Sequence, residues 1–95
     1  MNAAILRIGT TVTTPGIDEL LKSKALRHDD LIYALRRHAS GDWGDVPDED
    51  WEENNRSLAA GYSILSAYTD RLGIRFWIIT EGDRSVTTIL LPDEY

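Results

Sequence analysis

The sequence contains no cysteine among its 95 residues. Disulfides and thiolate metal sites are therefore excluded, and a small secreted protein held together by disulfides is disfavoured. Stability has to come from buried apolar side chains, which the 42% hydrophobic content with three Trp and four Tyr can supply. We expect a single domain over residues 1–95, whose folding removes roughly 60–65% of the unfolded surface from water.

Long hydrophobic runs are missing as well. The longest apolar stretches, at 76–79 and 89–92, fall far short of the ~20 residues needed to span a bilayer. The first residues lack the basic start and the apolar run of a signal peptide. We therefore expect a cytoplasmic protein without a membrane partner.

Positive charge is scarce, and negative charge is concentrated in one segment. The net charge is −6, and residues 42–53 hold seven acids and no base, so the rest of the chain is close to neutral. A protein that binds duplex nucleic acid needs a cationic surface, which is not expected here. Asp29 and Asp30 dilute the one basic cluster, which consists of Lys22, Lys24, Arg27, Arg36 and Arg37.

Three segments carry helix signals. Thr14 and Pro15 are a favourable cap and first residue for a short helix, whose apolar stripe is Ile17, Leu20 and Leu21. A second helix is predicted over 29–39, ended by Gly41. Its single apolar face has the spacing i, i+3, i+4 and i+7, at Leu31, Ala34, Leu35 and His38.

A third helix is predicted from Pro47 to about Ala60, with its acids at the positive end of the helix dipole. Its inner side is expected to carry Trp51, Asn55, Leu58 and Ala59.

The period then changes to that of strands. Segments 62–69, 74–80 and 85–91 are rich in β-branched and aromatic residues, and short turns separate them. Helices followed by strands predict an α+β fold. The expected architecture is three short helices packed on a three-stranded antiparallel meander, with residues 3–8 as a candidate short edge strand.

Two sequence blocks carry a family resemblance: Arg37-His38 with Gly41-Asp42-Trp43-Gly44, and the segment from Trp77 to Tyr95, which includes Asp83-Arg84-Ser85. Over residues 14–95 the chain resembles a family of small "plasmid related" bacterial proteins carried by plasmids, prophages and integrated elements. Some members are labelled as a restriction-enzyme methylation subunit. Catalysis of methyl transfer is excluded here by the short length and by the lack of a Gly-x-Gly-x-x-Gly loop. The resemblance implies no agreed activity and no catalytic residues.

His38 is a candidate catalytic residue. With Arg37, Ser40 and Asp42 nearby in sequence, it could act as a general base beside an arginine that holds phosphate. The alternative places His38 on the apolar face of its helix, bonded to a backbone carbonyl. The scarcity of further histidines favours this alternative.

The segment 80–88 gathers hydrogen-bonding side chains around one tight turn. Glu81 or His38 as base and Arg84 as charge stabiliser would make a small metal-independent nuclease. Alternatively, Asp83, Arg84 and Ser85 simply build a hairpin turn.

The acidic segment has three interpretations. Calcium loops need acids at alternate positions around a glycine, which this spacing does not provide. The segment can be a solvated helix start, or it can mimic nucleic acid and occupy a cationic groove of an enzyme. Trp43 and Trp51 are either stacking platforms for bases or core anchors. No metal and no cofactor are expected.

We therefore predict a non-enzymatic accessory protein of plasmid- or phage-type mobile elements that acts through contacts with an unidentified protein. Inhibition of a host defence enzyme that targets nucleic acid is the sharper hypothesis. A small metal-independent nuclease or toxin-like enzyme is the alternative. A homodimer is also predicted if the 85–91 strand lies at a sheet edge. The predicted interaction residues are Asp42, Trp43, Asp45, Asp48, Glu49, Asp50, Glu52, Glu53, Asp83 and Arg84.

Overall fold

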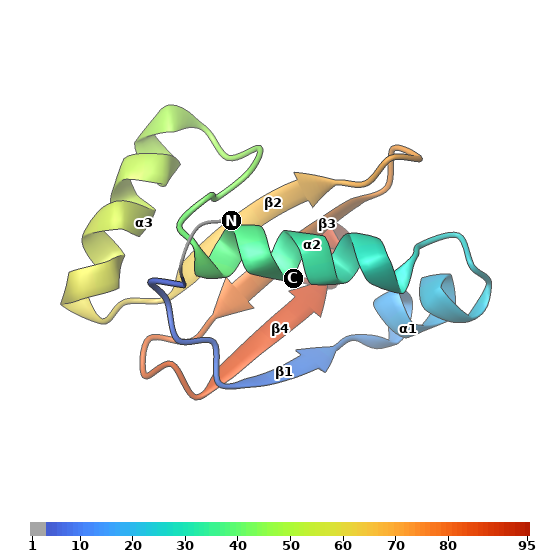
Figure 1. The fold of residues 1–95 in the computed structure, drawn as a ribbon, viewed down its shortest axis with the longest axis horizontal. Coiled ribbons are helices and arrows are strands. Elements are labelled where there is room, and N and C mark those ends of the chain that lie inside the picture. The colour runs from blue at the N-terminus through green and yellow to red at the C-terminus, as the bar shows by residue number, and fades with distance from the viewer. Residues whose placement is uncertain (1–3) are drawn as a thin grey trace.

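The computed structural model describes residues 4–95. Figure 1 shows the helices arranged around one twisted sheet. In chain order the elements are β1 (Thr10–Thr13), α1 (Pro15–Lys22), α2 (His28–Ala39), α3 (Asp48–Ala60), β2 (Ile64–Thr69), β3 (Arg75–Thr80), β4 (Val86–Leu90) and the 3-10 helix η1 (Pro92–Glu94). The α+β class and the three helices are confirmed.

The sheet has four strands in the order β1-β4-β3-β2, and it is mixed rather than purely antiparallel. The predicted meander is present, since β2 pairs with β3 and β3 pairs with β4, both antiparallel. The prediction missed β1, which runs parallel to β4 with Thr10 opposite Val86 and Thr13 opposite Ile89. The additional strand was expected at 3–8, where residues 4–8 form no strand and residue 3 lies outside the described residues.

The position of β4 also removes the premise of the predicted dimer. Both of its edges are paired, one with β1 and one with β3. The expectation that segment 85–91 offers an open edge to a second copy is therefore wrong.

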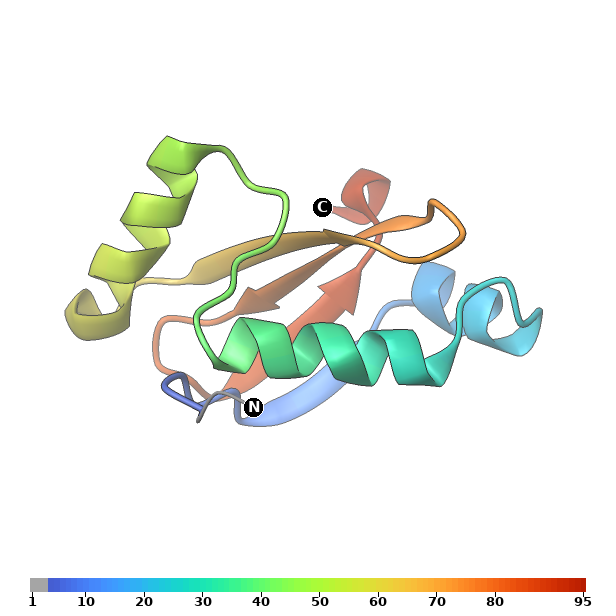
Figure 2. The same cartoon turned by 45° about the horizontal axis from the view of Figure 1, so that its top comes forward.

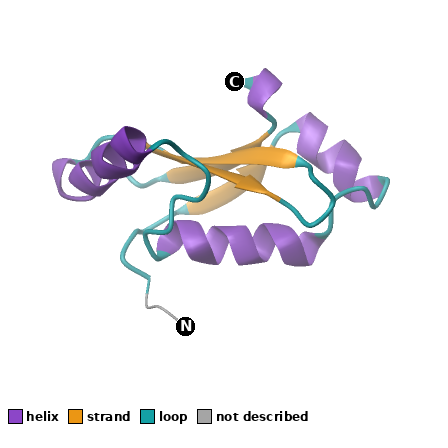
Figure 3. Ribbon diagram, turned by 90° about the horizontal axis from the view of Figure 1, so that it is seen from above, coloured by secondary structure: helices purple, strands orange, loops and turns teal. Residues whose placement is uncertain are grey.

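α2 covers one face of the sheet and forms the main core. Figure 3 shows it lying beneath the strands, with α1 and α3 at the two ends of the sheet. Along β3 buried side chains alternate with exposed or half-buried ones, so one face of the sheet meets the helix. The buried cluster consists of Ile17, Leu26, Leu31, Ala34, Tyr68, Phe76, Ile78 and Ile89.

α3 packs at the end of the sheet opposite α1, over a second, smaller hydrophobic cluster. Leu6, Trp43 and Ile64 are its buried members, and Trp51 and Leu58 of α3 pack against them. The loop before α3 covers the free edge of β2: Ala67 donates its N–H to the Trp43 carbonyl and accepts from the Asp45 N–H. This edge is therefore closed by the protein's own chain.

The opposite face of the sheet is more open. Within residues 4–95, Leu65, Trp77 and Ile79 on this face are only half-buried, and 42% of Val12 is exposed. The short η1 packs against β3 at one end, where Tyr95 meets Trp77 edge to face at 5.6 Å. Figure 3 shows η1 on this side of the sheet.

The C-terminal turn is tied to the start of α1. Thr14 is the cap residue as predicted, but its hydroxyl donates to Glu94 at 2.6 Å instead of capping its own helix. The other carboxylate oxygen of Glu94 accepts the Gly16 N–H at 2.9 Å. A carboxylate at a helix start satisfies N–H groups that have no partner within the helix. Among residues 4–95, no helix is long and apolar enough to cross a membrane.

Candidate functional site

His38 lies in the interior and belongs to a chain of buried hydroxyl groups. Its side chain is 0% exposed, with Nδ1 at 2.6 Å from the Ser66 hydroxyl and Nε2 at 2.8 Å from the Thr80 hydroxyl. Thr80 in turn contacts Thr87 at 2.7 Å, and Thr87 donates to the Ile8 carbonyl at 2.6 Å. The predicted partner, a backbone carbonyl near the turn, is replaced by two hydroxyls from β2 and β3.

The Ile8 carbonyl fixes the direction of this whole chain. A hydroxyl donates only one hydrogen bond, so Thr87, which donates to Ile8, must accept from Thr80. Thr80 must then accept from His38 Nε2–H. Geometry therefore places a proton on Nε2 of His38, and in the neutral ring Nδ1 accepts from the Ser66 hydroxyl.

Electrostatics supports the neutral form. Burial, and secondarily the charge of Arg84, lowers the pKa of His38 from 6.5 to about 4. A histidine with no exposed surface and both ring nitrogens occupied does not meet a substrate. The predicted general base is thus placed in the core, and the alternative of a buried, satisfied histidine describes it better.

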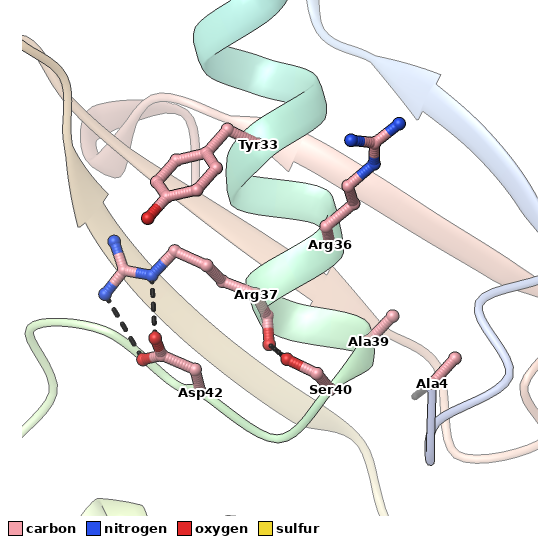
Figure 4. A pocket seen from close by; sticks show the side chains of 7 residues that line it. All are labelled: Ala4, Tyr33, Arg36, Arg37, Ala39, Ser40 and Asp42. Atoms are coloured by element: carbon pink, nitrogen blue, oxygen red, sulfur yellow. Dashed lines mark hydrogen bonds and ion pairs between the residues drawn. The ribbon is translucent and has the colours of Figure 1, made fainter. Parts of the chain in front are cut away.

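A surface pocket lies on the other side of α2 (Figure 4). Its volume is about 540 Å³. Arg37, Ser40 and Asp42, the sequence neighbours of His38, do come together here, although His38 points away into the core. The pocket is lined by Ala4, Tyr33, Arg36, Arg37, Ala39, Ser40 and Asp42.

Arg37 is held on three sides within this pocket. It donates to Asp42 from Nε at 2.8 Å and from Nη2 at 3.2 Å. Its guanidinium lies 4.9 Å from the ring centroid of Tyr68 and 5.9 Å from that of Tyr33. Arg37, together with the Gly44 N–H, lowers the pKa of Asp42, so the pair stays ionised. Arg37 is already neutralised, and the pocket offers a ligand only the charge of Arg36.

Sequence reasoning missed Tyr33 as a pocket residue. It is 66% exposed and stands on the same helix as Arg36 and Arg37. The spacing i, i+4 places Tyr33 beside Arg37 on one side of the helix, and Arg36 lines the pocket from the other side. That spacing was the available signal.

The acidic segment divides into two parts. Asp42 and Asp45 belong to the loop and have partners in the fold, since Asp45 accepts from the Thr69 hydroxyl at 3.1 Å. Glu53 on α3 pairs with Arg56 at 2.6 Å. The remaining acids of α3 are exposed and form no ion pair within residues 4–95: Asp48, Glu49, Asp50 and Glu52.

The predicted turn residues are used by the fold. Asp83 accepts from the hydroxyl and the N–H of Ser85, as in a capped turn. Arg84 donates to the carbonyls of Ser57, at 2.7 Å, and Tyr62, at 2.8 Å, so it ties the hairpin to the end of α3. It reaches the backbone carbonyl of Glu81, at 3.3 Å, and not the carboxylate.

Trp43 and Trp51 are placed as core anchors. Trp43 is 0% exposed, so it contributes no surface for a partner, contrary to its predicted role as an interaction residue. Its indole N–H donates to Asn55 at 2.9 Å, which ties α3 to the preceding loop. Asn55 is itself exposed, however, and the buried amide is Asn54, which donates to the Leu65 carbonyl.

The described residues contain no group of three or more His, Asp or Glu side chains that could hold a metal ion. Comparisons with protein-family models, with curated proteins and with solved structures found no match for this chain.

Proposed function

We propose that the protein acts by binding another protein, with the outer surface of α3 as its contact region. This acidic surface is defined as Asp48, Glu49, Asp50 and Glu52. The observation that supports the proposal most strongly is that these four carboxylates stay exposed and unpaired within residues 4–95, while His38, Asp83 and Arg84 are used in the fold.

The placement of α3 suits such a contact. Figures 1 and 2 show it at the β2 end of the sheet, projecting beyond the strands and away from α1. Trp51, Asn54 and Leu58 turn inward and fix the helix to the small core. The acids therefore stand on a rigid support, and little conformational entropy is lost when they bind.

The partner is proposed to present a cationic groove. An acidic helix can occupy such a groove and block its usual polyanion, because opposite charges attract and steer the encounter. The resemblance to proteins of mobile elements favours a host enzyme that targets nucleic acid. Inhibition of such an enzyme is the proposed biological role.

The geometry supports the nuclease alternative less well. His38 is enclosed, and the Arg84 guanidinium is directed at backbone carbonyls of α3 and its following turn. Neither side chain offers a free functional group beside the exposed Glu81. A catalytic trio would require the core and the turn to open.

The test begins with affinity capture of the tagged protein from a bacterial lysate at low and at high salt, followed by purification of any stoichiometric protein partner. The triple variant Asp48→Asn, Glu49→Gln and Glu52→Gln is then compared with a charge-matched control, Glu19→Gln, Asp29→Asn and Asp93→Asn. We expect the α3 variant to weaken binding at least about tenfold. The control should bind like the wild type.

Two results would contradict the proposal. Equal affinity of the two triple variants for the captured protein would show that the α3 acids make no specific contribution. Retention of RNA or DNA without a protein partner, with cleavage that survives purification, would favour the nuclease instead.

A further inference from the structure

β1 forms one margin of the sheet, and its outer edge has no partner strand among residues 4–95. Figures 1 and 2 both show β1 at the border of the molecule, with no helix lying along its outer side. All four of its residues are exposed, and none is charged: the strand reads Thr-Thr-Val-Thr. Natural edges are commonly protected by charges, prolines or bulges, and β1 has none of these within its span.

The backbone hydrogen bonds between β1 and β4 show which residues of β1 face outward. Thr10 donates its N–H to the Ser85 carbonyl and Thr14 donates to the Ile89 carbonyl, so the even-numbered residues bond to β4. Backbone groups alternate in direction along a strand, which turns the N–H and C=O of Thr11 and Thr13 toward the open edge. These two threonines offer a short hydrogen-bonding edge.

The surface beside this edge is apolar with a basic end. Figure 4 shows Arg36 on the side of α2 that is turned toward β1, and Tyr33 and Arg37 on the side turned toward β2. Ile32 precedes Arg36 by four residues and therefore shares its face. Ile32 is 48% exposed and Val12 is 42% exposed, so one apolar side chain flanks the edge on each face of the sheet.

Charge is distributed unequally along the edge. Arg7 precedes the start of β1, and Arg36 belongs to the last turn of α2. In the same turn, His38 is hydrogen-bonded to Thr80, which is hydrogen-bonded to Thr87 of β4. Thr87 is the register partner of Thr11, so this end of α2 lies near the start of β1. The exposed acids Asp18 and Glu19 of α1 follow the end of β1. Turning a second copy end for end brings the basic end of one against the acidic end of the other.

We propose that the outer edge of β1 pairs with the same edge of a second copy of this chain, antiparallel and centred on Val12. In this register Thr11 of each copy exchanges both backbone hydrogen bonds with Thr13 of the other, and Val12 meets Val12 across the two-fold axis. The two sheets become one continuous sheet. The α3 acids lie beyond β2 at the far margin of each copy, so their mutual repulsion is small. This pairing is independent of the function proposed for α3.

The first experiment is sedimentation of the full chain over a wide concentration range, with Thr11→Pro as the test variant. Proline removes an outward N–H that has no partner within residues 4–95, so the monomer should keep its thermal stability. Each dimer loses two equivalent donors, and the dissociation constant should rise about tenfold or more.

A second pair of variants tests the register. Val12→Lys and Val12→Glu should each be monomeric alone, because like charges meet at the two-fold axis. Mixed together they should form a heterodimer, which native mass spectrometry separates by mass from either homodimer.

Three outcomes would overturn the proposal. They are a wild type that stays monomeric at high micromolar concentration, a dimer that Thr11→Pro leaves unchanged, and a failure of the mixed Val12 variants to associate. A monomer that instead binds an extended peptide of another protein would assign the edge to that partner and would equally exclude the second copy.

Discussion

Among single residues, His38 illustrates how a polar side chain can specify a core. A buried imidazole without partners would cost several kcal/mol, and here both nitrogens are satisfied by hydroxyls of β2 and β3. The ring also stands edge-on to Trp43, with centroids 5.7 Å apart. His38 therefore joins the helix, the sheet and the smaller core through directed contacts, which apolar packing alone would not provide.

His38 makes stability depend on pH. Its pKa is about 4 in the folded protein and 6.5 in the unfolded chain, so the unfolded state binds more protons between these values. The contribution of neutral His38 to the free energy of unfolding is fully present above about pH 6.5. Up to about 3 kcal/mol of it is lost as the pH falls toward 4. Urea unfolding at a series of pH values measures this slope. His38→Gln should flatten the slope, whereas His28→Gln at an exposed position should retain it. If His28→Gln removes this pH dependence and His38→Gln keeps it, His38 is not the group that causes it.

Residue types gave a useful but incomplete view of the candidate site. The apolar spacing of Leu31, Ala34 and Leu35 correctly placed His38 on the inner face of its helix. The hydroxyls that hold it come from strands far along the chain, and no local pattern indicates that Ser66 and Thr80 will meet one histidine. Arg84 was ambiguous for the same reason, because its carbonyl partners belong to the end of α3.

Among the secondary-structure elements, the loop that covers β2 shows how closely backbone can pack. Gly44 has a φ of +74°, and a Cβ built there would lie only 2.0 Å from the Ala67 carbonyl oxygen. Any larger residue would separate the loop from the strand. Glycine is thus required for both conformation and space.

Gly73 is a suitable control for this close approach. Its φ is +87°, but a Cβ there would have no atom within 4 Å. Gly73→Ala should cost only the strain of the left-handed backbone, about 1–2 kcal/mol, whereas Gly44→Ala should cost clearly more. Chemical denaturation of both variants measures the difference. Equal losses would show that the loop moves away from β2 without cost.

The elements predicted best are those with strong local signals. Helix caps, prolines and the alternation of β-branched residues placed all three helices and the meander strands to within about two residues. β1 was missed because Thr-Thr-Val-Thr has no clear apolar alternation and is stabilised by pairing with a strand near the other end of the chain. Parallel pairing over such a separation leaves no local trace.

For the molecule as a whole, the C-terminal turn is joined to the segment that links β1 to α1. Glu94 accepts hydrogen bonds from Thr14, Gly16 and Leu91, and the Thr14 bond first and the backbone bonds second lower its pKa. These contacts close the sheet margin around the start of α1. They are exposed to solvent, so their effect should be seen in local opening more than in global stability.

Glu94→Ala tests this connection. We expect faster hydrogen exchange of the α1 amides and a lower melting temperature, because the start of α1 loses its acceptor. Asp93→Ala in the same turn is the matched control. Within residues 4–95 Asp93 forms no hydrogen bond with α1, so this variant should leave both measurements unchanged. Equal exchange rates in the two variants would show that Glu94 does not hold α1.

The parallel pairing of β1 with β4 has a consequence for synthesis of the protein. β1 is made before the other described strands, yet its partner strand within residues 4–95 begins at Val86. Until the segment through β4 has left the ribosome, the uncharged Thr-Thr-Val-Thr segment lacks this partner and can pair with a neighbouring nascent chain. The sheet should therefore close only when the last of its four strands becomes available.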